Sequence, residues 1–237
     1  MSNFFIDSGN IEGEVAYITG SDVNHIKNVL RMKEDDEIKL SPGNGLIYTA
    51  KISEFLPDRI VCKIVDCGGG KSELPAKIIL FQGLPKKDKM ELIIQKAVEL
   101  GVSEIVPVMM KRTIVKLEDS KKELKKLERW RTISLTAAKQ SGRIIVPNVS
   151  DFVTFNEAVN RAESLEFNLI PYENEKGMDR ARELVKEAKG KNSIGIFIGP
   201  EGGMKMGALP ISLGNRILRT ETAGLALISV LAFEIDI

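Results

Sequence analysis

The chain has few of the residues that build metal centres or disulfide-stabilised folds. It contains two cysteines, Cys62 and Cys67, and one histidine among 237 residues. Structural and catalytic zinc sites take three or four Cys, His or carboxylate ligands, so we expect no metal site. The two cysteines are also too few for a disulfide scaffold, and we interpret them as reduced core residues of a cytosolic protein.

Long hydrophobic runs and a secretory leader are lacking as well. No apolar stretch reaches the ~18 residues that a transmembrane helix requires, and no signal peptide opens the chain. We therefore predict a cytoplasmic protein with no membrane partner. Hydrophobic residues make up 43% of the sequence, which is enough for a substantial core in one large domain or two small ones.

The chain as a whole has almost no excess of positive or negative charge, because the formal net charge is only +1. The distribution is uneven, however. Residues 111–143 contain 11 Lys or Arg against four Asp or Glu, and the rest of the chain carries a net charge of −6. This concentrates a positive field in one region of the chain, where it can attract a polyanion.

The first 70 residues have the pattern of a small β domain. Short alternating runs occur at Val15–Thr19, Glu37–Leu40, Ile47–Ser53 and Arg59–Val65. One helix is predicted over Val23–Met32, and the composition of Asp66–Ser72 indicates a flexible linker. Several short strands without crossover helices predict a small β-barrel over residues 1–70.

From residue 73 the pattern changes to alternating strands and helices. Strands are predicted at Lys77–Phe81, Glu104–Val108, Phe167–Pro171 and Ile194–Ile198, and helices at Lys89–Leu100, Lys121–Ser141 and Met178–Ala188. Repeated βαβ units predict an α/β domain over residues 73–237, with a parallel sheet and helices on both faces.

Two glycine-containing loops follow strands near the end of this domain. The apolar run Ile194–Ile198 leads into Gly199-Pro200-Glu201-Gly202-Gly203, and Leu213–Arg219 precedes an apolar terminal helix. Glycine allows a ligand to approach the backbone closely. Two such loops at the carboxyl edge of a parallel sheet predict a ligand crevice, and no phosphate-binding GxxxxGK[ST] or GxGxxG loop is present.

These two segments, GPEGG and LGNRILRTETA, closely resemble the SPOUT methyltransferases with a C-terminal trefoil knot. The resemblance is to the RsmE family, which methylates N3 of a uridine in small-subunit (16S) ribosomal RNA. It implies that both loops hold S-adenosylmethionine, gripping the adenine largely through main-chain groups. It also implies a PUA- or OB-like RNA-binding domain at residues 1–70, a knotted SPOUT domain at residues 73–237, and a homodimer.

The resemblance assigns the cofactor site to the two loops and to the end of the strand Phe167–Pro171. The implied contacts are Leu169, Pro171, Gly199, Pro200, Gly202, Gly203, Leu213, Gly214, Ile217, Leu218 and Thr222.

The candidate catalytic residues are Arg219, Glu201 and Glu221. Methylation of N3 first requires loss of its proton, which either glutamate could accept while Arg219 steadies the anion. The sequence does not choose between the two glutamates. Thr220 is also expected to cap the terminal helix, because threonine is a favoured N-cap residue.

Basic residues in three segments resemble the RNA contacts of the family. The segments are NHIKNVLRMK, GLPKKDK and a region that ends in KQSGR, and the candidate contacts are His25, Arg31, Lys33, Lys86, Lys89, Arg112 and Arg143. Arg143 is expected to contact phosphate. The lysines of Lys121–Lys126 are expected to form a solvated helix face.

The chain departs from the family pattern in one place. The family carries a short helix between GPEGG and the next strand, whereas only Met204–Ala208 separate Gly203 from Leu209 here. Either the helix is lost or residues are missing between these positions, and we favour missing residues because so short a threaded loop would strain the knot. Two other functions stay open: ribose 2′-O-methylation by a SPOUT enzyme, and a non-catalytic RNA-binding factor in ribosome assembly.

Overall fold

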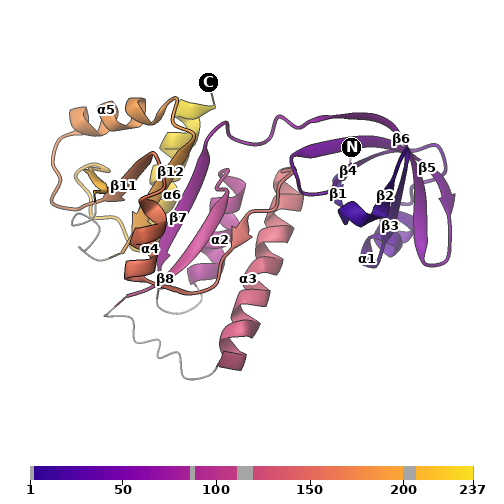
Figure 1. The fold of residues 1–237 in the computed structure, drawn as a ribbon, viewed down its shortest axis with the longest axis horizontal. Helices are drawn as coiled ribbons and strands as arrows, with labels where there is room; N and C mark the ends of the chain where they lie inside the picture. The colour runs from indigo at the N-terminus through magenta and orange to yellow at the C-terminus, as the bar shows by residue number, and fades with distance from the viewer. Residues whose placement is uncertain (1–2, 86–88, 111–119, 200–206, 237) are drawn as a thin grey trace. The chain divides into compact units, whose positions relative to one another are not determined.

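The computed structural model describes residues 3–85, 89–110, 120–199 and 207–236. Contacts divide the chain into two units (Figure 1). The first comprises Met1–Glu73 and Ala138–Val146, and the second comprises Leu74–Ala137 and Pro147–Ile237. The sequence pattern did not predict that residues 138–146 belong with the first unit.

The first unit is built on a curled, barrel-like sheet of six strands in the order β1-β4-β5-β6-β3-β2 (Figure 1). The strands are β1 (Asn3–Phe5), β2 (Ile11–Glu12), β3 (Val15–Thr19), β4 (Glu37–Ser41), β5 (Leu46–Phe55) and β6 (Arg59–Gly69). Neighbours are antiparallel except for β1 and β4, which are parallel. Alternation explains the core, because Ala16 and Ile18 of β3 point inward and are buried while their neighbours are not.

A short helical segment follows β3. A 3₁₀ turn, η1 (Ser8–Asn10), precedes β2, while α1 (Ser21–Asn24) continues into a π-helix, η2 (His25–Val29). Ile26 is fully buried against the sheet core, which fixes the segment in place. The helix predicted over Val23–Met32 therefore begins earlier and ends earlier than expected, and Arg31 after it adopts a left-handed conformation with φ of 54°.

The predicted linker Asp66–Ser72 is wrong for its first four residues. Strand β6 continues to Gly69, and its glycine-rich end pairs with β5, where Leu46 lies opposite Gly69 and Ile47 opposite Gly68. Glycine composition indicates a linker only when no neighbouring strand supplies hydrogen-bond partners. Here the long β5–β6 hairpin supplies them.

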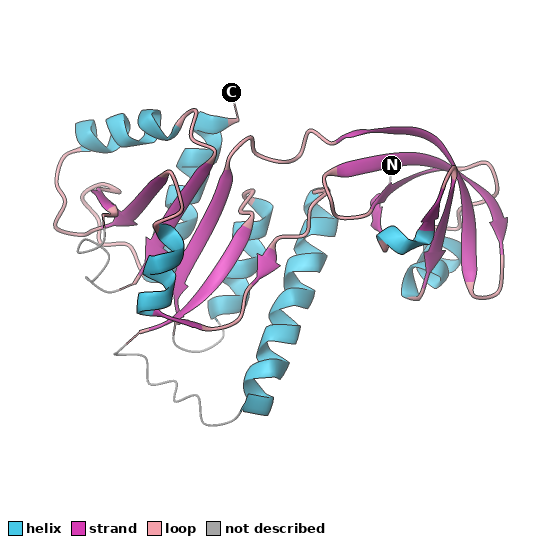
Figure 2. Ribbon diagram, viewed as in Figure 1, coloured by secondary structure: helices cyan, strands magenta, loops and turns pink. Residues whose placement is uncertain are grey.

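The second unit is a parallel sheet with helices on both faces (Figure 2). Its strands are β7 (Lys77–Gly83), β8 (Glu104–Met109), β9 (Asn148–Val149), β10 (Val153–Thr154), β11 (Phe167–Pro171), β12 (Ser193–Ile198) and β13 (Leu209–Ile211). Its helices are α2 (Lys89–Glu99), α3 (Ser120–Ser141), α4 (Phe155–Ala162), α5 (Met178–Ala188) and α6 (Thr220–Ile235), and the end of α3 from Ala138 onward belongs to the first unit. The strand order is β10-β8-β7-β12-β11-β13, with β9 paired to β8. The predicted α/β class and parallel sheet are confirmed.

Side chains from alternate strand positions pack against different helices. Phe81 of β7 stacks on Phe197 of β12, with ring centroids 4.4 Å apart, in a cluster that includes Ala158 and Ala162 of α4. The opposite face carries Leu80 and Ile198, which lie against Gly224 of α6. Helix α6 also packs on α2 and α5, so these three helices cover that second face.

The two cysteines lie in different environments. Cys62 is buried in the core of the first unit, and burial raises the pKa of its thiol to about 12. Cys67 is exposed, so the prediction of two core cysteines holds for Cys62 alone. In the described part of the chain, no helix is both long and apolar enough to cross a bilayer. The same residues contain no group of three or more His, Cys, Asp or Glu placed to hold a metal ion.

Candidate active site

The topology brings four strand ends to one edge of the second sheet. Strands β7, β12, β11 and β13 are adjacent and parallel, so their carboxyl ends meet at the same edge. The segments that leave this edge begin at Leu84, Gly199, Tyr172 and Ser212, and α6 starts after the last of them. Both glycine-containing loops predicted from the sequence therefore leave the same edge.

Two glycines at the centre of this edge are in close contact with their neighbours. A Cβ atom on Gly199 would lie 2.5 Å from Cε of Met110, and the φ of Gly199 is 151°. A Cβ atom on Gly83, on the neighbouring strand, would lie 2.8 Å from the carbonyl oxygen of Ile198. A side chain at either position would collide with these atoms, so glycine allows the ends of β7 and β12 and the Met110 side chain to pack closely.

The loop after β13 has a defined turn. Gly214 adopts a φ of 100°, and its N–H donates to the hydroxyl of buried Ser212 at 3.3 Å. Leu213 and Leu218 are half-buried, whereas Ile217 is 79% exposed. An exposed isoleucine beside a polar turn offers an apolar wall at the sheet edge, as a ligand with an aromatic ring would require.

The first turn of α6 differs from the predicted cap. Arg219 is the N-cap residue, and its carbonyl oxygen accepts from the N–H groups of Thr222 and Ala223 at 2.9 and 2.8 Å. Thr220 is the first helical residue, and its hydroxyl donates to Glu221 instead of capping the helix. The prediction of a Thr220 cap is wrong. The Arg219 side chain makes no capping hydrogen bond and is exposed.

Glu221 and Lys89, predicted for catalysis and for RNA contact respectively, are paired with each other. Nζ of Lys89 lies 2.5 Å from Oε1 of Glu221. The hydrogen bond from Lys89 is the main cause that holds the pKa of Glu221 below its ordinary value. Of the other cofactor candidates, Leu169 is fully buried within β11, Pro171 is half-buried at its end, and Thr222 is exposed on α6.

Gln82 is a residue of this edge that the sequence analysis missed. Its side chain is fully buried at the end of β7, where Nε2 donates to the carbonyl oxygen of Gly83 at 2.9 Å. Its Oε1 has no hydrogen-bond partner among the described residues. The available signal in the sequence was a glutamine directly after an apolar strand run. Buried polar side chains normally have hydrogen-bond partners, so a buried amide with an unpaired oxygen indicates a site where a partner could bind.

The candidate RNA contacts of the first unit are accessible. His25, Arg31 and Lys33 are all exposed on the segment that contains the π-helix. Arg31 holds its left-handed backbone without being glycine, a conformation that costs about 1–2 kcal/mol. Such irregularities are frequent at functional sites.

Arg143 does not lie where a phosphate contact requires. Its side chain is 3% exposed, and its guanidinium is paired with the carboxylate of Glu73. Glu73 also accepts from the N–H groups of Ile144 and Ile145 at 3.0 and 3.2 Å. The predicted phosphate contact at Arg143 is therefore wrong. The residue instead anchors the Ala138–Val146 segment within the first unit.

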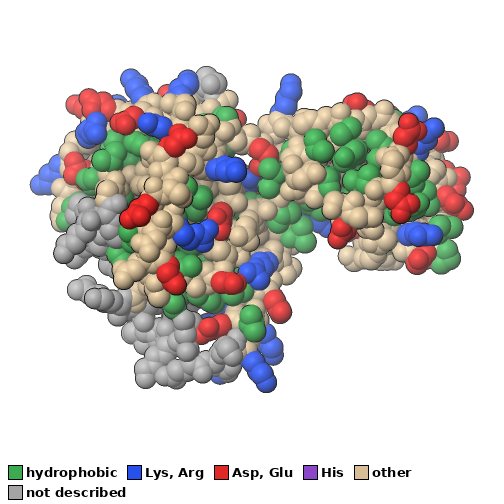
Figure 3. Space-filling view, in the orientation of Figure 1, with side chains coloured by type: hydrophobic (Ala, Val, Ile, Leu, Met, Phe, Trp, Pro, Cys, Tyr) green, Lys and Arg blue, Asp and Glu red, His purple; other side chains and the backbone are tan. Residues whose placement is uncertain are grey.

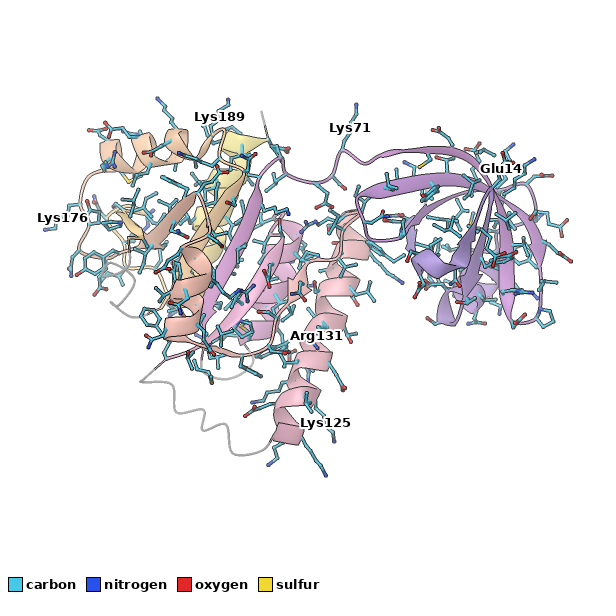
Figure 4. All side chains as sticks on the ribbon, in the orientation of Figure 1. Glu14, Lys71, Lys125, Arg131, Lys176 and Lys189 are labelled. Atoms are coloured by element: carbon cyan, nitrogen blue, oxygen red, sulfur yellow. The ribbon has the colours of Figure 1, made fainter. Side chains whose placement is uncertain are left out.

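Several basic side chains of the region 111–143 are paired with acidic residues, so fewer of them are available to a polyanion than the composition indicates. Lys139 pairs with Asp22 at 3.0 Å, and Arg131 pairs with Asp151 at 2.8 Å. Lys125, in contrast, projects from α3 into solvent, as Figure 4 shows. On the face of the second unit shown in Figure 3, basic and acidic side chains are interspersed. The expected solvated helix face is thus present at exposed Lys121, Lys122, Lys125 and Lys126.

Several predicted residues lie outside the described part of the chain. They are Pro200, Glu201, Gly202, Gly203, Lys86 and Arg112. The question whether the helix is lost or residues are missing between Gly203 and Leu209 also falls on residues outside the described part.

The sequence matches the family model of an RNA methyltransferase domain over residues 72–232, and that of an RNA methyltransferase PUA domain over residues 18–65. The first match alone covers more than half of the chain. The chain belongs to the RNA methyltransferase family. Within this family it is similar to proteins named ribosomal RNA small subunit methyltransferase E, which confirms the resemblance drawn from GPEGG and LGNRILRTETA.

The relative from Bacillus subtilis strain 168 is 35% identical, with 100% of this chain and 98% of the relative covered. The relative from Mesomycoplasma hyopneumoniae is 32% identical, with 90% of this chain and 91% of the relative covered. A solved structure of ribosomal RNA small subunit methyltransferase E from Neisseria gonorrhoeae, bound to S-adenosyl methionine, is also similar. It has a TM-score of 0.80 and 32% identity, and covers 98% of this chain and 96% of that one.

Proposed function

We propose that this protein is an S-adenosylmethionine-dependent methyltransferase that methylates N3 of a uridine in small-subunit ribosomal RNA. The observation that carries the proposal is the sheet edge where the chain leaves β12 at Gly199 beside the Ser212–Leu218 loop, with its turn at Gly214 and its exposed Ile217. Main-chain groups and an apolar wall suit an adenosine ligand that has no phosphate. The Neisseria relative holds S-adenosyl methionine.

The residues present fit this cofactor. We assign its contacts to main-chain groups of Gly199, Leu213, Gly214 and Leu218, with Ile217 and Pro171 as apolar neighbours. Bound there, S-adenosylmethionine supplies an electrophilic methyl group. Pro200, Gly202 and Gly203 belong to the same proposal through the family resemblance.

In the reaction, the protein has to remove the proton from uracil N3 and to stabilise the resulting anion. The pKa of a uracil N3–H lies about two units above neutrality, which at 1.36 kcal/mol per unit amounts to roughly 3 kcal/mol. A carboxylate acceptor and a cation near the carbonyl oxygens can supply this amount. Arg219 is exposed at the edge and is not used for capping, so we assign the cation role to it. Holding the base in line for transfer lowers the remaining barrier.

The first unit is proposed to set the register on RNA. His25, Arg31 and Lys33 present exposed basic side chains on one segment. Attraction by lysines alone is sequence-blind and salt-sensitive, so recognition of folded RNA requires a second, shaped contact. Because it is proposed to act on ribosomal RNA, we also propose a cytoplasmic location. The trefoil knot stays a prediction from the family resemblance, because its loop includes residues outside the described ones.

Calorimetric titration with S-adenosylmethionine tests the cofactor site. We expect saturable binding by the wild type and a loss of at least about tenfold in affinity for Gly199→Val, because a side chain there collides with Met110 in a backbone conformation that costs about 1–2 kcal/mol. Absence of saturable binding by the wild type would support the non-catalytic assembly factor.

Gly190→Val is the matched control for this substitution. Gly190 precedes the opposite end of β12, has a φ of 86°, and has no atom within 4 Å of its Cβ position. It carries the same kind of backbone penalty without the collision at the edge. Equal affinities of the two variants would show that the pocket lies elsewhere.

We also propose a homodimer formed through α6. One side of this helix is buried on the sheet through Leu227, Ile228 and Leu231, while Val230 is 47% exposed and Phe233 is 75% exposed. Exposed apolar residues on a helix that already buries its other side indicate a symmetric interface. In sedimentation at micromolar concentration, we expect a dimer for the wild type and a monomer for Phe233→Glu. Val65→Glu, at a 50% exposed position of β6, should stay dimeric. A monomeric wild type would contradict the interface.

A further inference from the structure

The first turns of two helices are joined by one ion pair at the candidate edge. Lys89 is the first residue of α2 and Glu221 is the second residue of α6. Their 2.5 Å contact is partly shielded from solvent, with side chains 38% and 16% exposed. The residues are 132 positions apart in sequence, and α2 and α6 pack against each other along the sheet.

The carboxylate of Glu221 already accepts hydrogen bonds from three groups. Besides Lys89, it accepts from the hydroxyl of Thr220 at 3.3 Å and from its own backbone N–H. These donors, Lys89 first among them, hold its pKa below the ordinary value. A general base is most effective with a pKa near the working pH and a free lone pair directed at the proton. Glu221 has a lowered pKa instead, and each of its oxygens already accepts a hydrogen bond, Oε1 from Lys89 and Oε2 from Thr220.

Helix electrostatics explain why the pair is placed here. A carboxylate near the amino end of α6 is stabilised by the helix dipole, whereas an ammonium at the amino end of α2 is destabilised by it. Lys89 is therefore poorly placed without Glu221. The pair compensates for this placement and ties the start of α6 to the start of α2.

We propose that Lys89 and Glu221 are positioning residues that fix Arg219 for methyl transfer, and that Glu221 is not the proton acceptor. Arg219 directly precedes the first turn of α6, so an anchored turn sets where its side chain leaves the helix. The proposal rests on the proposed methyltransferase activity. The proposal also means that Lys89 is not one of the RNA phosphate contacts, because its ammonium is paired with the Glu221 carboxylate.

Charge exchange in the full-length protein tests this proposal. The variants are Glu221→Gln, Lys89→Met and the exchange Lys89→Glu/Glu221→Lys, assayed for S-adenosylmethionine binding and for steady-state methylation of small ribosomal subunits. We expect each single variant to lower kcat about tenfold with little change in KM for RNA, since contacting pairs couple strongly. The exchange should recover activity to within about threefold of wild type. The acidic limb of the pH–rate profile should stay in all active variants.

Other outcomes would overturn it. If Glu221 is the base, Glu221→Gln and the exchange both lose activity by roughly a thousandfold or more, and the acidic limb disappears. If Lys89 is a phosphate contact, Lys89→Met raises KM and flattens its salt dependence. An unchanged kcat in both single variants would also contradict the positioning role of Lys89 and Glu221.

Two controls separate these outcomes from other failures. The exchange Lys96→Glu/Glu99→Lys inverts a 2.8 Å pair elsewhere on α2 and should keep full activity. Thermal unfolding of every variant separates lost positioning from lost folding. A wild type that binds no S-adenosylmethionine defeats the proposed function itself, and the positioning role falls with it.

Discussion

Arg219→Ala is expected to lower kcat for methylation of small ribosomal subunits by about 100- to 1,000-fold, the size of losing one preorganised group that stabilises developing charge. The fold should be unaffected, because only the carbonyl oxygen of Arg219 caps α6 and alanine keeps it. KM for RNA and affinity for S-adenosylmethionine should change little, since the interaction is expected mainly in the transition state.

Two matched variants sharpen this result. Arg216→Ala removes an exposed arginine from the same loop and should keep nearly full kcat. Arg31→Gly removes a proposed RNA contact while relieving the left-handed backbone, so it should raise KM for RNA and spare kcat. If Arg219→Ala raises KM and leaves kcat unchanged, Arg219 is a binding residue and its assigned role is wrong.

The second large effect concerns stability. Glu73→Ala should lower the free energy of unfolding of the first unit by roughly 3–5 kcal/mol, because it leaves the buried guanidinium of Arg143 unpaired. It also removes the acceptor of two backbone N–H groups, those of Ile144 and Ile145. Urea denaturation followed by circular dichroism measures the change.

The controls for Glu73 use one exposed pair and one double variant. Glu183→Ala breaks a 3.1 Å pair with Arg180 whose side chains are both more than half exposed, and should change stability by no more than about 0.5 kcal/mol. Glu73→Leu/Arg143→Leu should recover much of the loss, because an apolar pair can replace a buried ion pair. Equal effects of Glu73→Ala and Glu183→Ala would refute the buried anchor.

The same anchor changes what can be expected of the second domain alone. A fragment without residues 1–73 still contains Arg143 and Ile144, both buried within the first unit. Those residues would then face water or collapse elsewhere. Point substitutions in the full chain therefore separate the roles of the two units better than truncation does.

Local pattern was sufficient for the elements that flank the site. The predicted limits of β11 and α5 match the structure to the residue. Strand β11 is a short apolar run. Helix α5 has Gly177 before it and Gly190 after it, so its hydrophobic periodicity and its helix-ending glycines indicate the same limits. The carboxyl edge followed from the predicted parallel sheet alone, because parallel strands end together.

Contacts between distant residues were not predictable in this way. Glu73 and Arg143 are 70 positions apart, and Lys89 and Glu221 are 132 apart. No periodicity encodes such partners. A basic residue therefore looks the same in the sequence whether it faces phosphate or a buried carboxylate. The Thr220 cap failed for a local reason, because the helix begins one residue earlier than expected, with Arg219 as its N-cap and Thr220 as its first residue.

The most direct test is product analysis after methyl transfer. The purified protein is incubated with deuterated-methyl S-adenosylmethionine and small ribosomal subunits that lack uridine methylation, and the RNA is digested to nucleosides for mass spectrometry. We predict that the label appears in N3-methyluridine, and that it is lost with Arg219→Ala. Label in a 2′-O-methylated nucleoside, or no transferred label at all, would contradict the proposed function.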